Sequence, residues 1–160
     1  MRNITLGIMM YLFAATTFAN PMHYIEFFKS NDVKINMNGQ LISLYLKPDT
    51  FFHENSTALK PQSVSSQISE FINSYNAHEV ELVGYYEVGS SRRAIAITKA
   101  RVAQILRILK LKRPGIVVST RCENFVYYKH LPFWKDMQGD SFFEIKWRSS
   151  LPTQISVTHG

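Results

Sequence analysis

The stretch that decides the fold is VELVGYYEVGS, residues 80–90, followed directly by the helix-like run 94–111. Apolar residues alternate along its first half, which is typical of a half-buried strand. The glycine and serine that follow indicate a tight connection. The run after them repeats apolar or small residues at helical spacing, at Thr98, Val102, Ile105 and Leu109. This order predicts a strand over 80–86, a short loop and an amphipathic helix packed on the same sheet.

Two opposite charges flank this loop. Glu87 follows the strand, and Arg101 lies in the helix beside its apolar stripe. A carboxylate accepts charge-assisted hydrogen bonds from an ammonium group, and the planar fork of an arginine holds a carboxylate with two parallel bonds. The pair therefore favours a pocket for a zwitterion. The alternative is a salt bridge between strand and helix, worth about 0 to 1 kcal/mol if it is exposed.

The other segments alternate between strands and helices. Asn38-Gly39 separates two apolar runs, 33–37 and 41–46, and is a strong hairpin signal. Lys47-Pro48-Asp49 is expected to break the second run, and a helical stripe extends from Pro61 to Tyr75. Further strands are expected over 116–121 and 142–147, with an aromatic loop over 131–139. The pattern predicts an α/β (α+β) layer whose helices pack on one side of a mixed sheet.

The first residues predict export. A positive segment, 1–3, precedes the apolar run 4–15 and a small-X-small site at 17–19, as in a secretory signal peptide cleaved after Ala19. The alternative is an uncleaved anchor, but the run is shorter than the roughly 20 residues that span a bilayer. No cysteine follows the run, so we expect a periplasmic protein that is not a lipoprotein. The expected divisions are a signal peptide (1–19), an N-terminal extension with the first strand (20–37), one domain (38–150) and a flexible tail (151–160).

The chain is basic, with a net charge of +6 and a pI near 9.5, and its excess cations gather in 92–113. Export argues against nucleic acid, so an anionic envelope polymer or an acidic protein is the better partner. The alternative is a solvated helix face whose late cations complement the helix dipole. A content of 46% hydrophobic residues excludes a disordered chain. The single cysteine, Cys122, can form no internal disulfide and is expected to serve packing.

Catalytic and metal-binding patterns are absent from the sequence. The five histidines are scattered without the spacing of paired metal ligands. Gly84 and Gly89 lack the further glycines or the Lys-Ser of a phosphate loop. Cys122 and His130 are not in a recognisable nucleophile setting. We therefore expect neither a cofactor nor enzymatic activity.

The stretch 80–90, together with TKARV at 98–102, resembles the core motif of the OmpA-like peptidoglycan-binding domain. Three other segments are similar to that family over roughly 44–148: TFF at 50–52, NSTALKP at 55–61 and FEI at 143–145. The resemblance implies a βαβαβ-β order. It also implies that an acid and an arginine hold the free end of diaminopimelate in the cell-wall stem peptide. The implied ligand-binding residues are Glu87, Gly89, Ser90 and Arg101.

Departures from the family pattern fall near this pocket. Tyr86-Glu87 stands where the family has Thr-Asp, Ala94 replaces an asparagine, and Ser141-Phe142 replaces paired arginines. Glu87 keeps the charge but is one methylene longer. Segments 46–52, 132–134 and 139–148 further resemble the small OmpA-domain subunit of the Dot/Icm type IV secretion apparatus. That subunit is generally a lipoprotein, so a paralogue or a non-acylated relative is implied.

Two functions remain open at this point. In the first, the chain anchors an envelope protein complex to peptidoglycan, at the outer membrane or cell wall, by binding the diaminopimelate stem peptide. In the second, it is a degenerate OmpA-like structural subunit of an envelope-spanning secretion complex. That subunit would dock on other subunits through the aromatic side chains of Phe133 and Trp134.

Overall fold

A computed structural model describes residues 21–60, 64–125 and 141–150 of the chain. Its centre is a five-stranded sheet in the order β1-β2-β5-β3-β4. Neighbouring strands are antiparallel, except that β3 and β4 run parallel. The sheet is therefore mixed, and its strands are β1 (Lys34–Asn38), β2 (Leu41–Leu46), β3 (Glu79–Tyr86), β4 (Val117–Asn124) and β5 (Ser141–Arg148).

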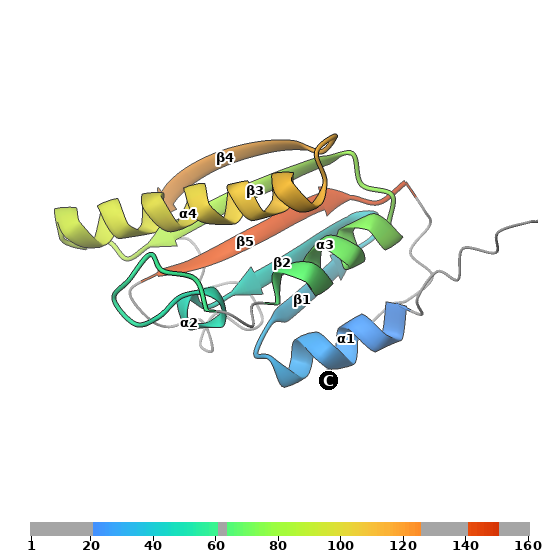
Figure 1. Ribbon diagram of the computed structural model, residues 1–160, viewed down its shortest axis with the longest axis horizontal. Coiled ribbons are helices and arrows are strands. Elements are labelled where there is room, and N and C mark those ends of the chain that lie inside the picture. Colours follow the sequence, from blue (N-terminus) through green and yellow to red (C-terminus); the bar gives the residue numbers. More distant parts are fainter. Residues whose placement is uncertain (1–20, 61–63, 126–140, 151–160) are drawn as a thin grey trace, which may run out of the picture.

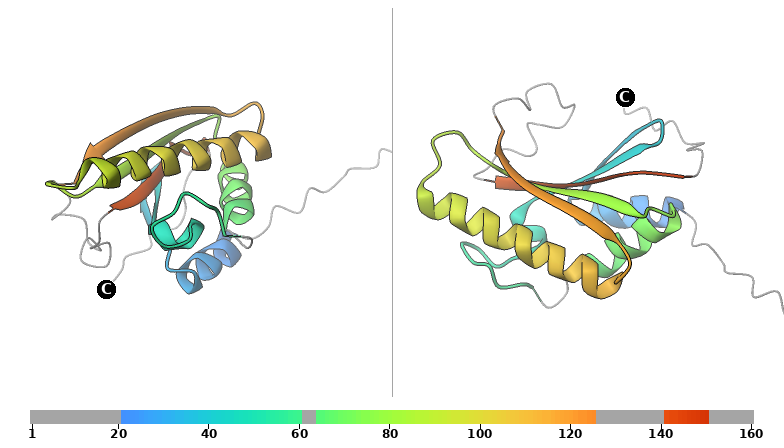
Figure 2. Two further views of the ribbon diagram at one scale, coloured as in Figure 1. Left: turned by 60° about the vertical axis from the view of Figure 1, so that its left-hand side comes forward. Right: turned by 90° about the horizontal axis from the view of Figure 1, so that it is seen from above.

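All the described helices cover one face of this sheet (Figures 1 and 2). The long helix α4 is the crossover that joins the parallel strands β3 and β4. The predicted fold class, with helices on one side of a mixed sheet, is confirmed. The helices are α1 (Pro21–Ser30), α2 (Pro48–Phe51), α3 (Ser65–Ser74) and α4 (Arg92–Lys112).

The predicted hairpin at Asn38-Gly39 is also confirmed. β1 and β2 pair in an antiparallel register that ends with Asn38 opposite Leu41. Gly39 has a φ of 58°, which glycine adopts without steric cost. The hairpin places β1 at one edge of the sheet and β4 at the other.

The main core lies between the sheet and the helices, because side chains along each strand alternate between the two faces of the sheet. On β5, Phe143, Ile145 and Trp147 all belong to the main buried cluster that includes the helix residues. Phe71 of α3 packs in an edge-to-face manner on Trp147, with ring centroids 5.8 Å apart. Aromatic pairs of this kind add to the stabilisation that comes from buried area.

Gly84 lets α4 approach β3 closely. A Cβ at this position would lie 2.5 Å from Cγ2 of Val102 and 3.2 Å from Cγ2 of Thr98. Both of these helix residues are buried, as the apolar stripe of the sequence predicted. The glycine therefore sets how α4 sits on the sheet, and with it where the residues of α4 lie.

Two helices differ from the expectations. The sequence predicts an extension and a first strand over 20–37, whereas the structure has the helix α1 there, which packs on α3. The Tyr24 hydroxyl donates to Glu70 at 3.2 Å, and Phe28, fully buried, contacts the Phe71 ring at 5.2 Å between centroids. β2 ends at Leu46, so the break expected at 47–49 is confirmed. The helix α2, which was not expected, begins at the break with Pro48 at its first position, where proline suits a helix.

Other expected boundaries are close to those observed. The helix predicted over 61–75 corresponds to α3, although 61–63 lie outside the described residues. The signal peptide over 1–19, the loop over 131–139 and the tail over 151–160 also lie outside the described part of the chain.

The sheet face opposite the helices carries a smaller buried cluster of Tyr45, Val83, Tyr85 and Phe142. Glu144 lies among these residues and is only 6% exposed. Its carboxylate accepts hydrogen bonds from the Ser43 hydroxyl at 3.0 Å and the Tyr85 hydroxyl at 2.7 Å. A buried carboxylate needs such partners, so this acid has a structural role in the closing strand.

Candidate functional site

The loop between β3 and α4 gathers three of the four residues predicted to bind a ligand. The Ser90 amide donates to the Glu87 carbonyl at 3.0 Å, which closes a turn. Gly89 has a φ of 87°, a left-handed conformation that disfavours a side chain. The Glu87 side chain is exposed at this turn.

Ser91 ends this loop and caps α4. Its side chain accepts a hydrogen bond from the Ala94 amide at 3.1 Å, as an N-cap serine does. Since the cap fixes where the helix begins, it also fixes the position of Arg101. Arg101 lies nine positions after the first helical residue, Arg92, a rise of about 14 Å along the axis. Long helical side chains point back toward the N-terminus, which shortens that separation for the guanidinium.

Arg101, the fourth predicted residue, is 7% exposed and held in place by backbone groups. Its Nε donates to the Ser56 carbonyl at 2.8 Å, and Nη2 donates to the His53 carbonyl at 3.4 Å. The guanidinium carbon lies 5.2 Å from the centroid of the Phe52 ring, a cation–π contact. Burial lowers the pKa of Arg101, but an arginine stays charged in proteins.

The loop 53–58 presents these carbonyls through its own hydrogen bonds. The His53 amide donates to the Ala58 carbonyl at 3.1 Å, and the Ser56 amide donates to the His53 carbonyl at 3.2 Å. The Ala58 amide donates to the Ser56 hydroxyl at 2.9 Å. Asn55 adopts a φ of 50°, a conformation that asparagine tolerates better than most residues. A defined loop thus lies against the guanidinium.

No carboxylate neutralises Arg101 among the described residues. The ion pairs found there involve other side chains, and none joins Arg101 to Glu87. The salt bridge that the sequence left open between these two residues is therefore not formed. Arg101 is a buried, oriented cation whose described partners are neutral.

The first turn of α4 carries further positive charge, on the outer side of the helix. α4 contains no acidic residue, and Arg92 and Arg93 occupy its first turn. Cations at the positive end of the helix dipole are unfavourable by roughly 0.3 to 1 kcal/mol each. The described structure offers these two exposed side chains no ion pair. The suitability of the candidate site for an anionic group therefore depends on Arg101 itself, and Arg92 and Arg93 form a separate positive surface.

The contacts of Arg101 with the carbonyls of His53 and Ser56 were not expected from the sequence. Their carbonyls contact Arg101 from more than 40 positions away, at sequence separations of 48 and 45. Backbone acceptors leave no signal in the residue types. Phe133 and Trp134, the predicted docking residues, lie outside the described part of the chain.

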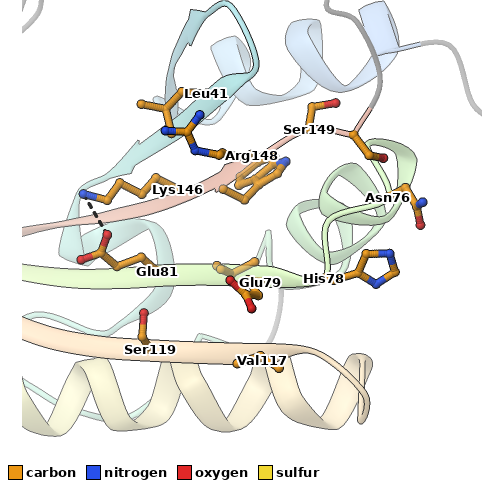
Figure 3. A pocket seen from close by; sticks show the side chains of 13 residues that line it. Leu41, Asn76, His78, Glu79, Glu81, Val117, Ser119, Lys146, Arg148 and Ser149 are labelled. Atoms are coloured by element: carbon orange, nitrogen blue, oxygen red, sulfur yellow. Dashed lines mark ion pairs between the residues drawn. The ribbon is translucent and has the colours of Figure 1, made fainter.

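A separate hollow of about 640 Å³ lies on the sheet face opposite the helices, at the end of β3 that is away from the β3–α4 loop. Figure 3 shows Glu81 and Lys146 facing each other across neighbouring strands, with an ion pair of 3.0 Å. Arg121 pairs with both Glu81 and Glu123. Burial alone would raise the pKa of Glu81, but the bonds and charges of Lys146 and Arg121 outweigh it and lower that pKa. These charges neutralise one another, so the hollow offers less to a charged ligand than Arg101 does.

The described residues show neither a metal-binding cluster nor a membrane-spanning helix. No cluster of three or more histidine, cysteine, aspartate or glutamate side chains with metal-binding geometry occurs there. Within the same ranges, no helix is both long and apolar enough to cross a membrane. Cys122 is half-buried and packs against the main core, and burial raises the pKa of its thiol.

Several solved structures share this fold. The cell wall anchor of the T6SS from Pseudomonas aeruginosa superposes with a TM-score of 0.61 and 11% identity, over 81% of this chain and 97% of that one. A putative MotB-like protein from Desulfovibrio vulgaris gives a TM-score of 0.58 and 11% identity, over 79% and 90%. The periplasmic domain of Helicobacter pylori MotB gives 0.53 and 12%, over 74% and 80%.

No family model matches the sequence, and no curated protein matches it. At identities of 11–12%, the structural likenesses establish a shared fold. They cover 74–81% of this chain.

Proposed function

We propose that this chain is an OmpA-like module that anchors an envelope protein complex to peptidoglycan by binding the diaminopimelate stem peptide. One observation carries the proposal: Arg101 is buried, oriented by two carbonyls and lacks a carboxylate partner among the described residues. Burial of a charged group costs desolvation free energy, and here no described ion pair offsets that cost. A functional role of Arg101 in binding an anionic ligand would account for it. The shared fold of a cell wall anchor supports the same proposal.

The chemistry of the ligand matches the available groups. A guanidinium has five N–H donors, and the two carbonyls take two of them, which leaves donors for a ligand carboxylate. Glu87, exposed at the turn, would accept from the ammonium group of the same zwitterionic centre. Ser90 and the backbone amides around Gly89 would bind the remaining polar atoms.

A second candidate function has its own observation. The bonds from Arg101 to His53 and Ser56 also fasten the loop 53–58 to α4, which a structural role alone would explain. In that case the chain is a subunit of an envelope-spanning secretion complex that binds protein partners and no peptidoglycan. Replacing Phe133 and Trp134 by alanine would then reduce recovery with the complex and leave the domain folded.

The setting is proposed from the sequence. Export by a cleaved signal peptide would place the chain in the periplasm, without a lipid anchor, beside the outer membrane or cell wall. The narrower resemblance points to the IcmN/DotK subunit of a Dot/Icm type IV secretion system. N-terminal sequencing of periplasmic material should begin at Asn20, within a residue or two, whereas an intact Met1 confined to membranes would contradict this setting.

Sedimentation with isolated cell-wall sacculi tests the main proposal. The parent chain should pellet with sacculi, Arg101→Ala should remain largely in the supernatant, and Arg101→Lys should be intermediate because it keeps the charge without the planar fork. Arg148→Ala is the matched control, since it removes an equal charge at an exposed position on β5. A parent chain that does not pellet, or equal losses in Arg101→Ala and Arg148→Ala, would contradict the proposal.

A further inference from the structure

The outer side of α4 carries a second, larger concentration of positive charge. Five exposed cations occupy it: Arg92, Arg93, Lys99, Arg107 and Lys110. With 3.6 residues per turn, they fall within an arc of roughly 120° and extend for about 27 Å along the axis. We call them the cationic face of α4. It points away from Arg101, which lies among the buried residues of the same helix.

Within the described ranges, this face takes part in no ion pair. α4 has no acidic residue, and the described ion pairs involve none of the five cations. The late cation Lys110 complements the helix dipole, but Arg92 and Arg93 oppose it. Helix stability therefore does not explain Arg92 and Arg93, and these two residues favour an external anionic partner.

The sizes of the side chains on the cationic face indicate what kind of partner it can bind. The residues between the cations are small, since Ala96, Ala100 and Ala103 are all exposed within the same arc. No aromatic residue occurs in α4, and Leu111, 70% exposed, is its one strongly exposed large apolar side chain. Protein interfaces centre on aromatic and apolar anchors and are depleted of charge at their core. A specific protein partner is therefore disfavoured.

We propose that the cationic face of α4 binds the anionic headgroups of a phospholipid membrane surface. Because lysine and arginine side chains are long and flexible, the five charges on this arc can reach one plane of headgroups together. The small side chains let the helix lie close to such a surface. Insertion is not expected, because the face has no apolar stripe to bury among acyl chains. This electrostatic contact would leave the Arg101 site free for its own ligand.

Vesicle binding tests this inference. The full chain is sedimented with vesicles of phosphatidylcholine alone and of an equal mixture of phosphatidylcholine and phosphatidylglycerol. The neutral vesicles give the baseline for the apolar segment 4–15, which every variant shares. The parent chain should prefer the mixed vesicles, and salt should weaken that preference because it screens surface charges.

Two double variants with the same net charge distinguish an effect of the cationic face from an effect of the total charge of the protein. Lys99→Gln/Arg107→Gln should weaken binding to mixed vesicles by about 25-fold, at roughly fivefold for each cation near the surface. Lys29→Gln/Arg148→Gln removes two exposed cations elsewhere and should change binding by about twofold or less. Circular dichroism would establish that both variants remain folded.

Three results would overturn the inference: no preference of the parent for anionic vesicles, equal losses in the two double variants, or a loss of sacculus binding alone in Lys99→Gln/Arg107→Gln. Arg101→Ala distinguishes this inference from the proposed function. It should bind mixed vesicles as the parent does while losing sacculi. A chain that binds vesicles but not sacculi would refute only the peptidoglycan proposal.

Discussion

Replacing Gly84 with alanine should strain the contact between α4 and β3. The new Cβ would lie 2.5 Å from Cγ2 of Val102, and a distance under 3.0 Å requires something to move. Val102 cannot turn away easily, because a β-branched side chain in a helix has one strongly preferred rotamer. The helix itself must shift, and Thr98 and Cys122, at 3.2 and 3.4 Å, limit the direction of that shift.

Overpacking of a core by one methyl group costs about 1 to 3 kcal/mol. For a domain of this size, the midpoint of thermal unfolding should fall by about 4 °C for each kcal/mol. Thermal and urea unfolding, followed by circular dichroism, would measure the change. Gly84→Ala/Val102→Ala should be more stable than the sum of the two single effects predicts, because each change relieves the other.

Gly115→Ala is the matched control for this prediction. Its added Cβ would meet nothing within 4 Å, and its backbone is not in the left-handed region. The substitution should be close to neutral. Two results would contradict a close approach of α4 to β3 at Gly84. One is that Gly84→Ala is as stable as Gly115→Ala, and the other is that the stability effects of Gly84→Ala and Val102→Ala are additive.

Three further predictions concern other parts of the chain. Glu87→Asp should keep or improve muropeptide binding, whereas Glu87→Gln should weaken it; equal affinity for Glu87→Gln and the parent would remove Glu87 from the site. Phe28→Ala should lower the free energy of unfolding by about 3 to 5 kcal/mol, against at most about 0.5 kcal/mol for exposed Lys29→Ala. A small effect of Phe28→Ala would mean that α1 is not part of the core. Because the pKa of Glu81 is lowered on folding, its contribution to stability is present at neutral pH and is lost as the pH falls below 4.5. The free energy of unfolding of Glu81→Gln should therefore decline less steeply with acid than that of the parent, by less than about 1 kcal/mol. The same decline in both proteins would contradict this prediction.

The arrangement around β3 and α4 could be predicted because its signals are local. The alternating residues of 80–86 and the helical spacing of Thr98, Val102 and Ile105 both report a buried face directly. The Asn38-Gly39 hairpin was predictable for the same reason, since a glycine with positive φ marks the turn. Each of these patterns depends on residues close together in the sequence.

The helix α1 was missed because its signal is short and ambiguous. Its buried residues Tyr24, Ile25 and Phe28 span little more than one turn, directly after the expected signal peptide. Its stability comes from Phe71 and Glu70, more than 40 positions away, and no local pattern reveals that contact. Tertiary packing of this kind decides most short helices.

The candidate site likewise has one feature that local sequence predicts and others that it does not. The position of Arg101 on α4 follows from helical spacing, but its fastening to the loop 53–58 depends on how a distant loop folds. The missing ion pair between Glu87 and Arg101 could not be predicted either. Opposite charges in one loop–helix unit suggest a pair, whereas the described structure directs Arg101 toward carbonyls.

Calorimetric titration of the folded chain with a diaminopimelate-containing muropeptide tests the central claim most directly. The parent should bind, and Arg101→Ala should bind roughly ten- to a hundredfold more weakly, since a hydrogen bond to a charged group is worth about 1.5 to 3 kcal/mol. Thermal unfolding of both proteins would establish that each is folded at the temperature of the titration. If the parent shows no binding, or if Arg101→Ala binds as tightly as the parent, Arg101 does not hold the stem peptide and the peptidoglycan-anchor account fails.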